Sequence, residues 1–212
     1  MTSLGNHLTP AWCDALPRRR GRLRWYRRSR SGLATLWLII AAPAMLTLLV
    51  FLSDVANIWL ARVELESGLE AAALASAQAW GKAGFPNTLT ARQTGVKFAL
   101  ANKVVGVPLV ITENYDSSGT PTPNQNASTT GNLIFGQVTT STSPYTVDPN
   151  TPGTCSSGFG GAVTARASVT INSLGATLFG VPLTPYSVQA TATARYNCTK
   201  NQAELIRVPL TP

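Results

Sequence analysis

Residues 18–62 read RRRGRLRWYRRSR (18–30), SGLATLWLIIAAPAMLTLLVFLS (31–53) and DVANIWLAR (54–62). No charged side chain lies between Arg30 and Asp54. At about 1.5 Å per residue, a helix over 31–53 is long enough to cross a hydrocarbon core about 30 Å thick. The stretch therefore predicts a transmembrane helix at 31–53.

The charges on the two sides of this segment are unequal. Eight arginines precede it and are expected to set its orientation: Arg18, Arg19, Arg20, Arg22, Arg24, Arg27, Arg28 and Arg30. Lys and Arg that flank a span stay on the cytoplasmic side. We therefore predict a single-pass protein of the inner (cytoplasmic) membrane, with a cytoplasmic basic tail at 1–30 and everything after residue 60 outside.

A cleaved signal peptide is the competing interpretation, because it also begins basic and then turns apolar. Its apolar core spans about 7 to 15 residues, which is shorter than 31–53. The small residues that could be cleaved, Ala73, Ala75 and Ala77, follow an acidic segment. A twin-arginine export signal is a further alternative, although 33–52 is more apolar than we expect of one. We expect an uncleaved anchor in the lipid bilayer.

The formal net charge of +8 is carried almost entirely by the N-terminal tail. Beyond residue 60, basic and acidic side chains nearly balance, so the outer region has no electrostatic footprint for nucleic acid. The arginine cluster could bind nucleic acid in the cytoplasm or anionic lipid headgroups. Its position directly before a span favours the lipid.

The apolar helix is expected to continue outside the membrane over 54–83. That segment is rich in Ala, Leu and Glu, which favour helix, and it contains no proline. Spacings of three and four predict a packing stripe formed by Val55, Ile58, Leu65, Leu69, Ala72, Ser76 and Ala79. Small residues at 71–79 would let another backbone approach closely. The alternative is a helical spacer without a packing partner.

Residues 84–212 are expected to form a small extracytoplasmic α+β domain. A helix is predicted to begin at the N-cap Thr90, with Gln93 completing a capping box, and to close at Gly106. Alternating polarity predicts strands at 107–112, 133–139, 162–171 and 186–196. Segment 116–131 predicts a mobile loop. The fold class is α+β, with one transmembrane helix continuing into a long helix that packs on a small antiparallel sheet.

The three cysteines fall in two predicted compartments. Cys13 is expected to be cytoplasmic and reduced. Cys155 and Cys198 lie in the exported part, where oxidising conditions permit a disulfide. A bridge would join a Gly/Ser-rich loop to the end of the last predicted strand, and the alternative is two free thiols.

No catalysis and no cofactor are expected. The single histidine, His7, lies in the predicted cytoplasmic tail, and no Cys or His cluster has metal-ligand spacing. Glu113, Asp116, Asp148 and Glu204 form no recognisable catalytic pair, and no phosphate loop or nucleophile elbow is present. We predict a non-enzymatic protein without a small-molecule substrate.

One segment resembles a known family. Residues 54–62, followed by Glu64-Leu-Glu66 and Glu70-Ala-Ala-Ala-Leu-Ala75, are similar to the N-terminal signature of TadE/TadG-like proteins of the tight-adherence (Flp) pilus system. In that family a span ends in an Asp-containing segment, and Leu-Gln and Asp-Ala-Ala-Ala-Leu-Ala patterns follow. Glu66 and Glu70 replace the usual Gln and Asp here. The specific likeness covers residues 31–76.

The resemblance implies a non-enzymatic envelope protein, pilin-like or accessory, that helps to assemble or anchor an adhesive pilus. Other pilus-assembly envelope proteins would be its partners. Gly32 is followed at the fifth position by Trp37 and not by the Glu of processed pilins, which argues against a processed major pilin. The alternative function is a membrane-tethered binding or adhesion domain unrelated to pili.

Candidate partner-contact residues lie along the helix: Asp54, Arg62, Leu65, Leu69 and Ala72. An acidic residue beside a bilayer is a candidate for pairing with a partner, which makes Asp54 the foremost of them. The alternative is that Asp54 is solvated or hydrogen-bonded to Asn57.

Overall fold

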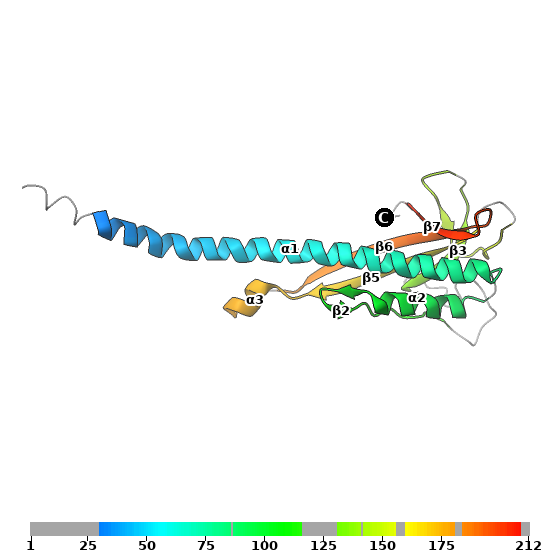
Figure 1. The fold of residues 1–212 in the computed structure, drawn as a ribbon, viewed down its shortest axis with the longest axis horizontal. Coiled ribbons are helices and arrows are strands. Elements are labelled where there is room, and N and C mark those ends of the chain that lie inside the picture. The colour runs from blue at the N-terminus through cyan, green and yellow to red at the C-terminus, as the bar shows by residue number, and fades with distance from the viewer. Residues whose placement is uncertain are drawn as a thin grey trace, which may run out of the picture. The chain divides into compact units, whose positions relative to one another are not determined.

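A computed structural model of the chain describes residues 30–85, 87–115, 131–140, 142–155, 160–180 and 184–208. The helices of this part are α1 (Arg30–Lys82), α2 (Leu89–Ala101) and α3 (Leu174–Phe179). The strands are β1 (Lys103–Val104), β2 (Val107–Pro108), β3 (Leu133–Val138), β4 (Val147–Asp148), β5 (Gly161–Ile171), β6 (Tyr186–Asn197) and β7 (Gln202–Ile206) (Figure 1). A long apolar N-terminal helix followed by antiparallel strands confirms the α+β class.

Helix α1 joins the predicted span and its predicted extension in one element, which Pro43 does not end. Within the described residues, it is the one helix long and apolar enough to cross a membrane. The chain divides into two compact units, Met1–Leu48 and Leu49–Pro212. The end of the predicted span therefore belongs to the same unit as the outer domain, together with Asp54 and the rest of α1.

The main sheet has five antiparallel strands in the order β4-β3-β5-β6-β7. Val163 of β5 is opposite Phe135 of β3 and Ala194 of β6, and all three side chains are buried. Thr164 and Thr193 alternate to the other face, where their hydroxyl oxygens lie 3.0 Å apart. This alternation places Ala and Val on one face and Thr on the other, as the sequence pattern predicts.

Small side chains let α1 approach the sheet and leave space for one large ring. The Trp80 ring meets Phe85 edge-on at 5.0 Å and Phe135 at 5.1 Å between centroids. A Cβ atom added to Gly161 of β5 would lie 2.3 Å from the Trp80 ring, so this strand position must be glycine. Trp80 therefore fixes how the C-terminal end of α1 sits against the sheet.

Helix α2 begins and ends earlier than predicted. The N-cap is Thr88 and not Thr90, and the hydroxyl of Thr88 does not cap the helix. It accepts a hydrogen bond from the Arg92 Nε instead, at 2.9 Å. The helix ends at Ala101 and not at Gly106, and Val104 lies in β1.

Several elements differ from the predicted strands. Of 107–112, only Val107 and Pro108 pair in a strand; Leu109 and Ile111 are buried in the core without a ladder partner among the described residues. The Thr112 N–H donates to the Asn132 side chain at 3.0 Å, so a side chain replaces the ladder. Elements β4, β7 and α3 were not predicted. The predicted loop lies outside the described residues except for its last residue.

The contact of α1 with α2 passes through Gly95. A Cβ atom added there would lie 2.1 Å from the Ser76 Oγ and 3.3 Å from the Ala72 carbonyl oxygen. Ser76 is fully buried, so it has little room to move. We expect Gly95→Ala to lower the free energy of unfolding by about 1–3 kcal/mol through overpacking. Denaturant unfolding of the detergent-solubilised chain measures this cost.

Gln93→Ala is the control, because Gln93 lies on the exposed side of the same helix. It should leave the unfolding midpoint unchanged. Equal stability of the two variants would show that α1 and α2 can separate at this point without cost.

Candidate functional site

Most of the residues predicted to set the topology lie outside the described part of the chain. These are Arg18, Arg19, Arg20, Arg22, Arg24, Arg27 and Arg28. Arg30 is the first residue of α1. Their proposed role therefore stays a prediction.

The packing stripe is present, but it packs on this chain itself. Leu65, Leu69 and Ala72 have no exposed surface and belong to the core formed with the sheet and α2. The chain's own domain therefore occupies the face on which we predicted a contact with another protein at these three residues. Val55, predicted in the same stripe, is 49% exposed.

Asp54 has partners within its own chain. Its Oδ2 accepts a hydrogen bond from the Ser173 hydroxyl at 2.5 Å, and its Oδ1 accepts one from the Leu174 N–H at 2.7 Å. Only 8% of Asp54 is exposed. Neither a partner protein nor Asn57 is needed to satisfy the carboxylate. Asp54 therefore joins α1 to the start of α3, more than a hundred residues later in the chain.

Local signals explain why α3 forms where it does. Ser173 is its N-cap, with the hydroxyl accepting a hydrogen bond from the Ala176 N–H at 3.3 Å. Gly180 ends the helix in the left-handed region at φ 63°, which glycine adopts without strain. The Ser173 and Gly180 pair is a start and stop signal that could have predicted this helix. Nothing in the sequence shows that Asp54 meets it.

The strands β5 and β6 carry this helix away from the main sheet. β3 pairs with β5 only as far as Ala165, and β7 pairs with β6 only from Thr193 onward. Beyond those points the two long strands continue as a pair to Ile171 opposite Tyr186. Figure 1 shows this two-stranded ribbon running beside α1, with α3 at its end.

Arg62 lies on the exposed side of α1. Its Nε donates to the Glu66 Oε1 at 3.0 Å, one helical turn away. Both side chains are largely solvated, so the pair adds little stability. Arg62 therefore remains available to another protein, unlike the three buried residues of the stripe.

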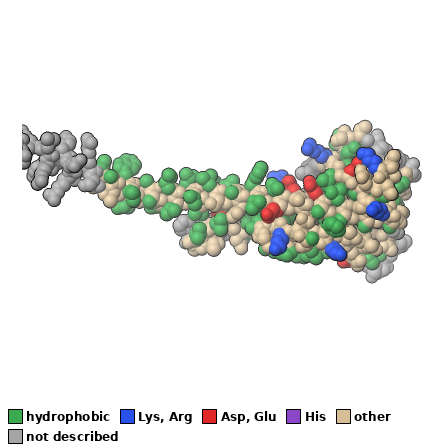
Figure 2. Space-filling model, viewed as in Figure 1, with side chains coloured by type: hydrophobic (Ala, Val, Ile, Leu, Met, Phe, Trp, Pro, Cys, Tyr) green, Lys and Arg blue, Asp and Glu red, His purple; other side chains and the backbone are tan. Residues whose placement is uncertain are grey.

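A groove of about 1170 Å³ runs beside this ion pair. Its wall from α1 carries Arg62, Glu66 and Glu70, and its wall from β6 includes residues 189–193. Along β6 the segment 186–192 has no strand on the β7 side within the described residues. Figure 2 shows acidic and basic side chains close to one another on the drawn face of the domain. The groove thus combines an open strand edge with a charged rim.

Two buried or half-buried charges stabilise the domain and were not predicted. Arg92 donates to the Glu113 and Leu133 carbonyl oxygens at 2.8 and 2.9 Å and stacks 4.6 Å from the Phe135 centroid. Burial lowers the pKa of Arg92 to about 10, so it stays charged at neutral pH. Burial raises the pKa of Glu204, but hydrogen bonds from Arg195 and Asn197 outweigh it and hold that pKa below the usual value.

Cys155 and Cys198 are joined by a disulfide in the structure, with their Cα atoms 5.8 Å apart. The bond ties the segment after β4 to the turn after β6. The two cysteines are 43 residues apart in sequence, a separation for which the chain-entropy relation gives a stabilisation of about 4 kcal/mol. Among the described residues, no group of three His, Cys, Asp or Glu side chains could hold a metal ion.

A family of known proteins matches the long helix and the charged segment within it. Residues 32–79 match the family model described as putative Flp pilus-assembly TadE/G-like. This part of the chain is a TadE/G-like segment. The match confirms the resemblance, covers most of α1 and stops before α2. Neither a curated protein nor a solved structure matches the chain.

The TadE/G-like match supports a role in Flp pilus assembly and fits an anchor in a membrane. The matched residues include Asp54, Arg62 and the buried stripe. Within this segment, Asp54 and the buried stripe hold the domain together, whereas Arg62 is exposed.

We predict that Asp54→Ala frees α3 from α1. It removes the acceptor of two hydrogen bonds, one of them from a buried hydroxyl, at a cost of about 1–3 kcal/mol. Hydrogen exchange of the detergent-solubilised chain should therefore become faster at 174–180.

Ser53→Ala is the matched control, because the Ser53 hydroxyl bonds only to the Leu49 carbonyl oxygen of its own helix. Exchange at 174–180 should not change in that variant. Protection of α3 that survives Asp54→Ala would mean that apolar contacts hold it without the carboxylate.

Proposed function

We propose that this chain is a non-enzymatic accessory component of a Flp-type pilus-assembly apparatus. It is anchored in the inner membrane by α1, with the tail inside the cell and the α+β domain outside. The observation that carries this proposal is the TadE/G-like match, which spans both the apolar part of α1 and the part that forms the core of the domain. The match therefore runs from the predicted anchor into the core of the domain.

A partner would meet the domain at the groove beside Arg62. The open edge of β6 at 186–192 offers backbone groups to an added strand, which is a common mode of peptide recognition. Glu66 and Glu70 on one wall and Arg207 on the other provide charges of both signs. These features fit an extended segment of another envelope protein.

The orientation can be tested with protease. In spheroplasts, added protease should digest the domain while leaving an epitope placed before Arg18 intact, because arginines beside a span stay in the cytoplasm. Immunoblotting of both ends measures this. A soluble form beginning after Ala75 would contradict the anchor and favour a cleaved export signal.

The groove can be tested by photo-crosslinking in cells. A photoreactive residue at Thr191, which lines the groove, should crosslink to an envelope protein of the pilus apparatus. The same group at Lys97, an exposed position on α2, should not. Mass spectrometry identifies the products.

Loss of the chain should also abolish surface pili and adhesion, scored by microscopy and binding assays. Adhesion lost while pili remain normal would favour a membrane-tethered adhesion domain. Equal crosslinking at both positions would show that the groove is not the binding surface. It would not contradict the proposed role in assembly.

A further inference from the structure

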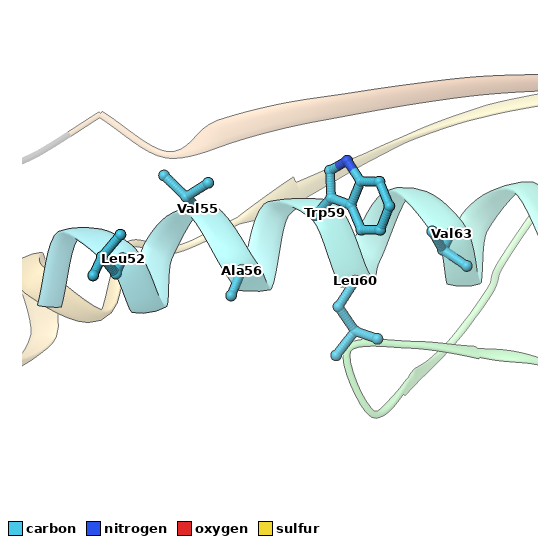
Figure 3. Close-up of a pocket in the computed structure, with 6 residues that line it drawn as sticks. All are labelled: Leu52, Val55, Ala56, Trp59, Leu60 and Val63. Carbon is cyan, nitrogen blue, oxygen red and sulfur yellow. The ribbon is translucent and has the colours of Figure 1, made fainter. Parts of the chain in front are cut away.

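The membrane-proximal part of α1 has a buried face and an opposite face that is apolar but exposed. One contains Asp54, Ala61 and Leu65 and is buried against the chain's own domain. The opposite face is formed by Leu52, Val55, Ala56, Trp59, Leu60 and Val63, which line a shallow apolar surface (Figure 3). Trp59 is 72% exposed. A water-soluble helix would carry polar residues on that second face.

The exposed face changes character after Val63. The next residues along the same side are Glu66, Ser67 and Glu70, all polar. From Leu33 to Val63 the helix is about 45 Å long at 1.5 Å per residue, which equals a hydrocarbon core together with both headgroup regions. Trp59 falls within the last part of that length, where tryptophan is favoured at the membrane surface.

Helix α3 lies at the level where the predicted span ends. A Cβ atom added to Gly175 would lie 3.2 Å from the Val50 Cγ1 and 3.5 Å from the Asp54 Oδ2. Leu178 is 68% exposed, and no charged residue occurs between Arg166 and Arg195. Tyr186, where β6 begins, is also exposed. Helix α3 and the end of the β5–β6 ribbon therefore have apolar and aromatic side chains facing outward, and the segment between Arg166 and Arg195 contributes no charge.

We propose that α3 and the end of the β5–β6 ribbon dip into the outer surface of the lipid bilayer, giving the domain a second membrane contact beside α1. The Asp54 carboxylate then needs no water, because Ser173 and Leu174 satisfy it. The occupant is lipid because the exposed apolar face is continuous with the part of α1 that crosses the membrane. The inference depends on the anchor and not on the role in pili.

Spin labels on the full chain in vesicles of phosphatidylethanolamine and phosphatidylglycerol test this. Cys13→Ser leaves the introduced cysteine as the free thiol while the Cys155–Cys198 disulfide stays intact. Labels are placed at Leu178→Cys and, independently, at Leu174→Cys. Phe98→Cys on α2 is the matched control, since Phe98 is also a large exposed apolar residue. Flotation first establishes that each variant is anchored.

Collision with oxygen, which concentrates in lipid, is compared with collision with a water-soluble nickel chelate. The ratio of oxygen to nickel collisions should be several-fold higher at 178 and 174 than at 98. Equal ratios at the three positions would overturn the proposal. Exclusion of both reagents at 178 and 174 would also overturn it, because a second protein copy and not lipid would then cover α3.

Discussion

The fold depends on how closely α1 can approach the rest of its domain. Leu65, Leu69 and Ala72 are fully buried, and Gly95 brings α2 within contact of the α1 backbone. Larger side chains at Ala72 or Gly95 would separate the helices, and the dense packing of a protein interior does not absorb such a change. Trp80 is the exception, and a glycine in β5 makes room for its ring. The anchor helix is thus also the central element of the core.

One helix supplies both the predicted span and part of the core of the domain. The chain divides into two compact units at Leu48, so the last residues of the predicted span belong to the unit that contains the domain. The side chains of α1 that hydrogen-bond or pack inside that unit include Asp54, directly after the predicted span. The same stretch of helix thus carries both the end of the apolar segment and the first contacts of the domain core.

The charged residues of α1 serve different purposes according to the side of the helix on which they lie. Asp54 faces inward, and its carboxylate accepts hydrogen bonds from the chain itself. Arg62 and Glu66 face outward and pair weakly in solvent. Glu64 lies between these two directions and accepts a hydrogen bond from the Val105 N–H at 2.6 Å, which fixes the β1–β2 turn on α1. Of the acidic residues on this helix, Asp54 and Glu64 therefore bond to other parts of the domain, whereas Glu66 lies at the surface.

The sequence by itself determined the elements whose signals are local and long. The uncharged segment from 31 to 53, the helix-forming run after it, and the alternating strands β3, β5 and β6 could all be predicted, because burial of apolar side chains imposes a period on the chain. The TadE/G-like segment was also recognisable from its own residues. Short elements such as β4 and β7 could not be predicted, because their few residues show no period.

Only the tertiary structure decided what those elements meet. The spacing of apolar residues predicted a packing stripe on α1. The sequence does not say whether that stripe packs on another protein or on the chain's own sheet. Asp54 was identified from the sequence as a candidate contact with another protein, whereas the hydrogen bond that the structure shows comes from Ser173, 119 residues away. Hydrogen bonds between distant residues leave no periodic trace in a sequence, so the clamp between α1 and α3 was decided by the fold and not by any local pattern.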